Sequence, residues 1–460
     1  MSRGAPPTVE PPVDASGSPA PTAAAVARAS LLNLVARLAS GAAVFAVTVI
    51  STNVLDTHGR GVYAILATWI SIGVMITTSG TTVLSAELIY ARHAERVLHG
   101  ASSAIAVMSA VVLLPLSVVI SLFVGGATLA AMLSTAAATI LLTYCCFELS
   151  IAQARGDVLR VSLTDIGMSL FPLVATAAAV VLFDPTVTAL VAAWAVGALV
   201  MAAVLFASAI SNGSPMIARA WRVGMSIERR SLGVALANTT TLLCQRIDVL
   251  VVAAVISVSA AGIYSIPVAL AVSLLLLSRS LLTATYRSIM TAPASEVSGR
   301  LGAALRHSVI IVLVAGGLSV PLVALAAGFV FGDAYAEIWQ WYVILVPGSA
   351  FACVTEILRH FLLTRVERQR EFVLVATGML LLNFVLAVVG AATIGLAGAA
   401  ASTTITYAAG AVALVAICAR LLSVPMRELA VPRRSDLDSY GRVVRAAMAR
   451  PRSTRSVKHS

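Results

Sequence analysis

The sequence has almost no lysine and few charged residues of any kind. Lys458 is the single lysine among 31 basic residues, and charged residues make up 11% of the 460 positions, against about 25% in a typical soluble domain. The G-x-x-x-x-G-K-[ST] segment of P-loop ATPases is absent, and so are H-E-x-x-H and G-x-S-x-G segments. These absences argue against nucleotide hydrolysis, zinc proteolysis and α/β-hydrolase chemistry. We expect no enzyme and no catalytic residue.

Cysteine is also scarce. The five cysteines all lie inside apolar runs, and apart from one adjacent pair none has a spacing typical of metal sites: Cys145, Cys146, Cys244, Cys353 and Cys418. A free cysteine in such a run usually behaves as a small core hydrophobe. The six histidines form no ligand set with recognisable spacing either. We therefore expect no metal site and no cofactor.

Long apolar runs dominate the sequence, and 59% of its residues are hydrophobic. A run of about 18 or more apolar residues is long enough to span the hydrocarbon core of a membrane as a helix. No alternating ten-residue pattern of barrel strands occurs. The sequence therefore predicts an all-α polytopic membrane protein. We count twelve spans: 30–52, 62–88, 101–124, 127–150, 160–183, 186–208, 231–256, 262–288, 304–330, 337–363, 371–394 and 396–421.

The basic residues predict the orientation. Cytoplasmic loops carry an excess of arginine and lysine. If the N-terminus is inside, Arg60 is the only basic residue in an outer loop. The net charge of +11 is therefore explained by membrane topology, and we expect no nucleic-acid partner. We expect a multi-pass protein of the bacterial plasma membrane with both termini in the cytoplasm. The inner loops hold Arg92, Arg96, Arg155, Arg160, Arg219, Arg222, Arg229, Arg230, Arg300, Arg306, Arg365, Arg368 and Arg370.

Two segments are similar across the chain. GVYAIL (61–66) matches GIYSIP (262–267), which aligns Gly61 with Gly262 and Tyr63 with Tyr264. Further on, GMSLF (167–171) resembles GMLLL (378–382), and GALV (197–200) resembles VALV (412–415). Six helices are thus followed by six related helices. Because six is even, the two lobes lie parallel, an arrangement of secondary transporters in which the substrate path runs between the repeats.

The predicted domains follow from this repeat. Residues 1–29 form a disordered cytoplasmic lead, 30–208 the first lobe, and 209–230 a cytoplasmic linker. The second lobe covers 231–421, and 422–460 is a basic cytoplasmic tail. The predicted outer loops are short. They leave no room for the outer domain that a membrane glycosyltransferase or polymerase normally needs.

The seventh span holds the densest polar cluster, ANTTTLLCQRID (237–248). At 100° per residue, Asn238, Gln245 and Asp248 share one face, whereas Arg246 lies on another. An arginine or aspartate at the bilayer centre costs about 2.5–3.5 kcal/mol on insertion scales. Each therefore needs water, a neighbouring helix or a ligand. Two interpretations stay open: the residues line a transport cavity, or they form a buried ion-pair network that fixes the packing.

Other charged and polar residues complete the candidate set. Asn33 and Arg37 share a face of the first span, and Arg279 lies in the eighth. Each arginine either lines the cavity or snorkels to the inner headgroups.

Several acidic residues are interpreted as structural. Glu356 can pair with Arg359 and His360 within the tenth span. Glu148 and Asp165 fall near inner helix ends and are interpreted as interfacial.

The stretch LLCQRIDVLVVAAVISVSAAGIYSIPVAL (242–270) resembles the seventh and eighth helices of Wzx-type polysaccharide flippases, with their R-x-D and G-x-Y-S motifs. NVLDTHGRGVYA (53–64), AQARGD (152–157) and FGDAYAEIWQWYVILVPG (331–348) also fit. The likeness covers about residues 30–421. It implies the fold of the multidrug/oligosaccharidyl-lipid/polysaccharide exporter (MOP) superfamily, with two six-helix lobes around a cavity, as in MATE transporters. The long lead, the basic tail and the lack of lysine in the lobes depart from typical Wzx proteins.

The resemblance further implies gradient-driven flipping of undecaprenyl-pyrophosphate-linked oligosaccharide from the inner to the outer leaflet. Arginine binds phosphate oxygens well, so the candidate cavity residues are Arg246, Arg37, Arg279, Gln245, Asn33 and Asn238, with Asp248 for ion coupling. Expected partners are the lipid-linked oligosaccharide, membrane lipids, and a polysaccharide polymerase or glycosyltransferases.

Three other functions remain open. A multidrug antiporter of the same superfamily would need acidic residues facing cationic drugs, whereas the mid-membrane charges here are mainly basic. A lipid II flippase of the MurJ type also has cavity arginines but commonly has fourteen helices. From a different class, the chain could be a non-transporting scaffold that recruits polysaccharide enzymes through its tail.

Overall fold

The computed structural model describes residues 23–78, 95–121, 127–155, 157–211, 217–290 and 292–431. In these ranges 12 helices are long and apolar enough to cross a membrane, which confirms the predicted twelve spans. They are α1 (Ala23–Val54), α2 (Thr57–Thr78), α4 (Glu95–Ser121), α5 (Leu129–Arg155), α6 (Val158–Leu182), α7 (Val187–Ser211), α8 (Ile217–Val255), α9 (Val258–Met290), α10 (Ala294–Phe331), α11 (Ile338–His360), α12 (Gln369–Ile394) and α13 (Leu396–Leu422).

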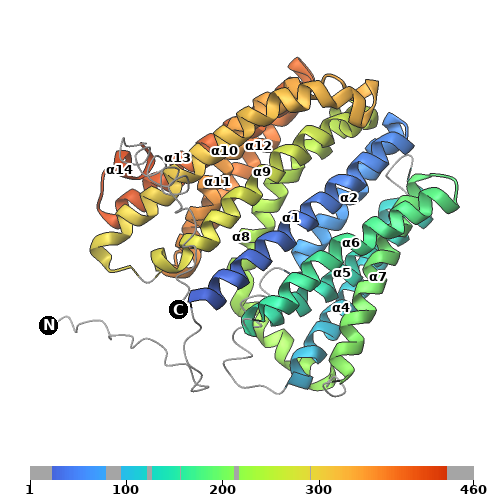
Figure 1. Cartoon of the computed structure of the whole chain (residues 1–460), viewed down its shortest axis with the longest axis horizontal. Coiled ribbons are helices and arrows are strands. Elements are labelled where there is room, and N and C mark those ends of the chain that lie inside the picture. The colour runs from blue at the N-terminus through green and yellow to red at the C-terminus, as the bar shows by residue number, and fades with distance from the viewer. Residues whose placement is uncertain are drawn as a thin grey trace, which may run out of the picture.

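The helices form two lobes side by side, α1 to α7 and α8 to α13 (Figure 1). In the first lobe α1 packs on α6, α2 and α4 pack on α5, and α7 packs on both α5 and α6. The second lobe repeats this pattern: α8 packs on α12, α9 and α10 pack on α11, and α13 packs on both α11 and α12. The predicted internal repeat is therefore a repeat of packing as well as of sequence.

Side-chain caps fix where several helices begin. At the start of α2, the backbone N–H of Gly59 donates to Asp56 Oδ1 over 2.8 Å. Thr128, Thr186 and Ser257 accept in the same way from the third residue after each of them, at the starts of α5, α7 and α9. Such N-caps satisfy backbone donors that have no partner within the helix. The α1–α2, α6–α7 and α8–α9 connections thereby turn within a few residues at one end of the bundle, which we call the short-loop end (Figure 1).

The two similar segments lie against each other at the short-loop end. A Cβ built on Gly61 would overlap the carbonyl group of Val258, and one built on Gly262 would lie 2.6 Å from the carbonyl oxygen of Thr57. Thr57 relates to Gly61 as Val258 relates to Gly262, so the contact is reciprocal, like an isologous interface. Only glycine lets α2 and α9 approach this closely. The motif that repeats in the sequence is therefore the contact between the lobes.

Two further contacts join the lobes near this end. The side-chain amide of Asn53, late in α1, donates to the carbonyl oxygen of Val330, late in α10, over 2.8 Å. The rings of Phe45 and Phe331 meet edge to face with 5.8 Å between their centroids. Helices α1, α2, α9 and α10 therefore hold the lobes together at the short-loop end, and we call their contacts the seal.

Several helices begin before the predicted spans, and one short helix lies outside them. Helix α1 begins at Ala23, within the segment 1–29 that the sequence assigns to a disordered lead. Helix α8 begins at Ile217, inside the predicted linker. The short helix α14 (Met426–Ala430) follows α13, and its Leu429 is fully buried. The hydropathy of a span predicts where a helix enters lipid, not where its hydrogen bonding begins.

Substitution of Gly61 by alanine tests the contact between the lobes. Because the new Cβ would collide with backbone atoms that cannot rotate away, we expect Gly61→Ala to lower the free energy of unfolding by about 1–3 kcal/mol. Thermal unfolding of the purified protein measures this. Gly378→Ala is the matched control, since a Cβ there meets nothing within 4 Å, and it should leave stability equal or higher. Equal stability of the two variants would contradict the contact.

Candidate substrate-binding cavity

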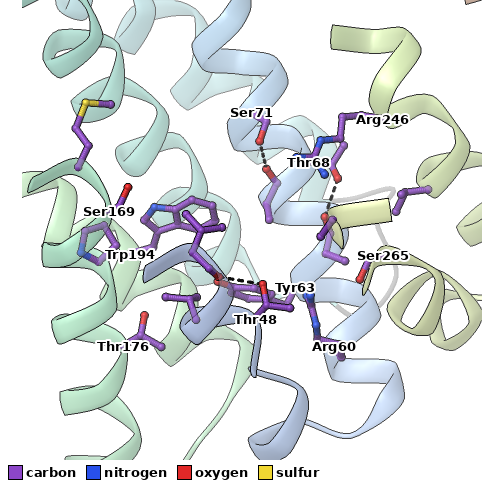
Figure 2. Close-up of a pocket in the computed structure, with 18 residues that line it drawn as sticks. Thr48, Arg60, Tyr63, Thr68, Ser71, Ser169, Thr176, Trp194, Arg246 and Ser265 are labelled. Atoms are coloured by element: carbon purple, nitrogen blue, oxygen red, sulfur yellow. Dashed lines mark hydrogen bonds between the residues drawn. The ribbon is translucent and has the colours of Figure 1, made fainter. Parts of the chain in front are cut away.

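A cavity of about 170 Å³, which we call the arginine cavity, lies between the lobes. Its walls come from α1, α2, α6 and α7 of the first lobe and from α8 and α9 of the second. It lies close to the seal, because Arg60 and Tyr63, which flank Gly61 in α2, both line it (Figure 2). From the second lobe, Arg246 and Ser265 complete the wall.

Two arginines line this cavity, one from each lobe: Arg60 is buried and Arg246 is half-buried. Arg60 is 5% exposed, and its guanidinium lies over the ring of Tyr63, 5.3 Å from the ring centroid. The Nε atoms of Arg60 and Arg246 are buried and have no hydrogen-bond partner within the described structure. Among the described residues, no carboxylate lies within 4.0 Å of either guanidinium. Buried charges are normally paired, so this pair of arginines is suited to an anion from outside the protein.

The sequence predicts Arg60 in an outer loop and does not reveal its place in the cavity. The Asp56 cap starts α2 at Thr57, before the apolar run begins. Arg60 therefore lies in the first turn of the helix, and the close approach of α2 to α9 buries it. A signal was present, because Arg60 immediately precedes the repeated Gly-x-Tyr motif.

A second cavity, of about 310 Å³, adjoins the first and is lined mainly by α1 and α9, with single residues from α6, α8 and α10. Arg246 lines both cavities, so it stands where they meet. Arg37 lines the second cavity together with Asp165. Asp165, interpreted from the sequence as interfacial, lies on this wall. Phe45 and Phe331, which belong to the seal, also line it.

Asp248 lines a different cavity from Arg246, in agreement with their predicted places on different faces of one helix. Its side chain is fully buried and accepts hydrogen bonds from Tyr264 Oη at 3.1 Å, Thr403 Oγ1 at 3.0 Å and the backbone N–H of Val249 at 2.8 Å. Together with Gln245, Asp248 and Thr403 line a cavity of about 30 Å³ within the second lobe. Asp248 and Gln245 thus form a compact polar site apart from the cavity between the lobes.

Among the described residues, Asn238 lines none of these three cavities. Asn238 accepts a hydrogen bond from Arg359 Nη1, and Arg359 pairs with Glu356 over 2.7 Å. The structural interpretation of Glu356 and Arg359 therefore agrees with this geometry, and Asn238 belongs to the same network instead of the expected cavity. The side chains of Asn33 and Arg279 lie outside the described residues.

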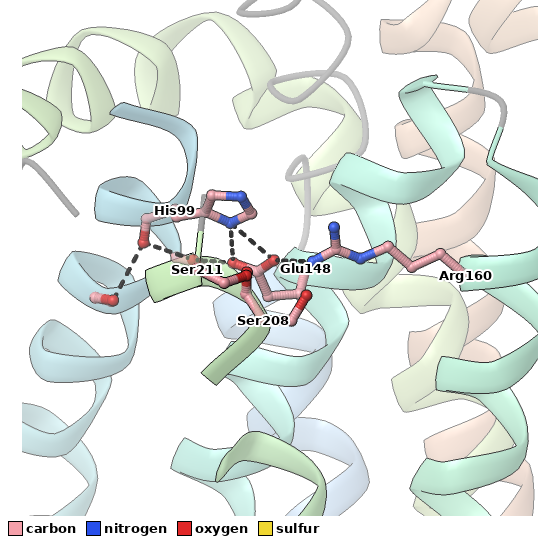
Figure 3. A network of polar contacts seen from close by, with 7 residues as sticks. His99, Glu148, Arg160, Ser208 and Ser211 are labelled. Carbon is pink, nitrogen blue, oxygen red and sulfur yellow. Dashed lines mark hydrogen bonds and ion pairs between the residues drawn. The ribbon is translucent and has the colours of Figure 1, made fainter. Parts of the chain in front are cut away.

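A second buried network lies in the first lobe (Figure 3). Glu148 is 1% exposed; it pairs with His99 Nδ1 over 2.9 Å and accepts from Ser102 Oγ over 2.7 Å. Arg160 approaches it to 3.3 Å. Glu148, interpreted from the sequence as interfacial, is therefore buried between helices, because hydropathy reports depth along a span and not the direction that a side chain faces. The network joins α4, α5 and α6.

The structure resembles solved transporter structures. It superposes on the eukaryotic MATE transporter AtDTX14 with a TM-score of 0.66 and 12% identity, covering 91% of this chain and 98% of that one. An inward-facing multidrug resistance MATE transporter of the MOP superfamily gives 0.65 and 13%, over 83% and 94%. The lipid II flippase MurJ, inward closed, gives 0.59 and 13%, over 93% and 94%. The chain therefore has a MATE-like fold.

The sequence itself gives no further match. No protein-family model matches the chain, and no curated protein is similar to it. At 12–13% identity the likeness to MOP structures establishes the fold, and function has to be argued from the site.

The hydrogen bonds to Asp248 can be tested within this MATE-like fold. Tyr264→Phe and Thr403→Val each remove one donor while keeping the side-chain shape. Because a hydrogen bond to a charged group contributes about 1.5–3 kcal/mol, we expect each change to lower the free energy of unfolding by that amount. Thermal unfolding measures it. The same changes made in an Asp248→Asn background should have smaller effects, and equal effects in both backgrounds would contradict the assignment.

Proposed function

We propose that this chain is a flippase that carries undecaprenyl-pyrophosphate-linked oligosaccharide from the inner to the outer leaflet of the bacterial plasma membrane. One observation carries the proposal. Arg60 from the first lobe and Arg246 from the second line one cavity, each has a buried Nε atom without a hydrogen-bond partner, and neither has an ion-pair partner among the described residues.

The charge of these arginines favours a phosphate-bearing cargo. A buried charge that lacks a partner costs several kcal/mol. A cavity with two unpaired arginines is therefore expected to bind an anion in preference to a neutral or cationic molecule. Guanidinium groups form forked hydrogen bonds with phosphate oxygens. A pyrophosphate has oxygens enough to engage an arginine from each lobe at once. Such a ligand would draw the lobes together.

The second cavity supports the lipid part of the proposal. Apart from Arg37, Asp165 and Arg246 its walls are mainly apolar, and they include Leu270 and Leu276 of α9. A pyrophosphate held at Arg246 would place the first isoprenoid units against these side chains. The rest of the lipid tail would extend between α1 and α9 toward the bilayer.

Alternating access by rocking of the lobes is the mechanism we propose. The reciprocal contact of Gly61 and Gly262 closes the short-loop end, which the distribution of arginines predicts to be the outside. Opening it would expose the cavity to the outer leaflet. An electrochemical gradient would supply direction, with the coupling ion bound at Asp248. The polar residues in the wall of this small, otherwise apolar cavity are Gln245, Asp248, Ser349, Thr403 and Tyr407. Oxygen ligands suit hard cations.

Drug antiport is the second candidate, because several of the similar structures are multidrug transporters. Asp165 in the second cavity is the one observation that favours it, since a carboxylate attracts cationic drugs. Arg60 and Arg246 act against a cationic cargo.

Neutral replacement of the cavity arginines tests the proposal. We expect Arg60→Gln and Arg246→Gln, each made in the native cells, to cause lipid-linked precursor to accumulate in the inner leaflet and surface polysaccharide to fall at least about tenfold, as the loss of one charged hydrogen-bonding partner implies. Extraction of the precursor and quantification of the surface glycan measure both effects.

Arg300→Gln is the matched control, because Arg300 is 41% exposed and pairs with Glu296 at the surface. Membrane levels of all variants must be equal. Unchanged precursor in both cavity variants would exclude the flippase proposal. Altered drug sensitivity instead would favour antiport, and loss of polysaccharide only on deletion of residues 432–460 would favour the scaffold.

Ion coupling at Asp248 is tested separately. In proteoliposomes we expect Asp248→Asn to abolish the acceleration of flipping by an imposed proton or sodium gradient. Binding of the cargo in the absence of a gradient should stay within about twofold, because Asp248 lies outside the arginine cavity. A fluorescent polyprenyl-pyrophosphate glycan reports flipping. Retained gradient dependence in the variant would remove Asp248 from the coupling role.

A further inference from the structure

The arginine cavity has an aromatic wall that binding of a pyrophosphate alone does not require. The rings of Tyr63 and Trp194 pack together with 6.4 Å between their centroids and a tilt of 30°. Both line the cavity, Tyr63 from α2 and Trp194 from α7 (Figure 2). The guanidinium of Arg60 lies over the ring of Tyr63. Arginine, tyrosine and tryptophan thus follow one another along the wall of the first lobe.

One hydroxyl on this wall is buried and unsatisfied. Thr176 of α6 is 1% exposed, and its Oγ1 has no hydrogen-bond partner within the described structure. By contrast, the hydroxyls of Thr48 and Thr68 on the same cavity donate to carbonyl oxygens of their own helices, over 3.0 and 2.8 Å. Buried hydroxyls without a partner are rare and costly. Thr176 is therefore poised to bond a polar group that enters the cavity.

An aromatic face beside a free hydroxyl is suited to a sugar ring. The axial C–H bonds of a pyranose form an apolar, slightly positive face, which packs on the negative face of an aromatic ring. Its hydroxyl groups need hydrogen-bond partners, which a few well-placed polar groups in an otherwise apolar pocket supply. A drug-like cation or a bare isoprenoid would leave Thr176 unpaired.

We propose that Trp194 and Thr176 bind the pyranose ring attached directly to the pyrophosphate, and that they thereby distinguish a glycosylated carrier lipid from the bare one. The inference rests on the proposed function, since it takes the phosphates to lie at Arg60 and Arg246. The order of residues along the wall supports it: the charged end at Arg60 continues through Tyr63 to Trp194. The lipid leaves on the other side, because Arg246 is shared with the apolar second cavity.

Two probes that differ by one sugar test this assignment. The full-length chain, purified into lipid nanodiscs, is titrated with undecaprenyl pyrophosphate and with the same lipid carrying one N-acetylglucosamine, and binding is measured by native mass spectrometry. We expect Trp194→Leu and Thr176→Val each to weaken binding of the sugar-bearing probe about three- to tenfold, the range of one aromatic contact or one hydrogen bond. Binding of the bare probe should change less than twofold, and Trp194→Phe should keep most of the affinity for both.

The outcomes separate the two levels of the argument. If Trp194→Leu and Thr176→Val weaken both probes equally, or neither, the sugar site is wrong while the flippase proposal stands. If the native chain binds neither probe, or if Arg60→Gln and Arg246→Gln bind both as well as the native chain does, the proposed function itself fails. Thr176→Val exchanges a hydroxyl for a methyl group of similar size, so it carries the test even if Trp194→Leu does not fold.

Discussion

The backbone contact of α2 with α9 is the constraint on which the rest of the structure depends. Gly61 and Gly262 allow two helices from different lobes to touch with no side chain between them. This contact fixes the position of the first turns of both helices. One residue before Gly61 comes Arg60, and two after it comes Tyr63, so the seal and the arginine cavity share the same turn of α2. A small change in the approach of the lobes therefore acts directly on the binding site.

The protein treats its buried charges in two ways. Glu148 is surrounded by His99, Ser102 and Arg160, and Asp248 by two hydroxyls and a backbone N–H. Those groups join helices within one lobe, and Asp248 also lines the small cavity proposed for the coupling ion. Arg60 and Arg246 have polar atoms left without partners. Since every unsatisfied buried group opposes folding, their presence at one cavity is best understood as preparation for a ligand, and their sign indicates that the ligand is an anion.

The sequence predicted the features that depend on periodicity and on runs. Twelve spans follow from the length of apolar runs, and the separation of Arg246 from Asp248 follows from 100° per residue. It did not predict Arg60, because a side-chain cap at Asp56 starts α2 before the apolar run. Nor did it predict the partner of Asn238, since Arg359 lies 121 residues away. The direction in which Glu148 faces depends on how α4, α5 and α6 pack, which one sequence does not reveal.

The reciprocity of the glycine contact has a consequence for leakage. Val258 stands to Gly61 as Thr57 stands to Gly262, so the two halves of the junction are related by an approximate twofold axis. Both halves lie between the same two helices, α2 and α9, so separating these helices parts both halves. Under the proposed function, the barrier on this side of the membrane would then open as one unit, which limits the leakage of ions while the cargo is loading.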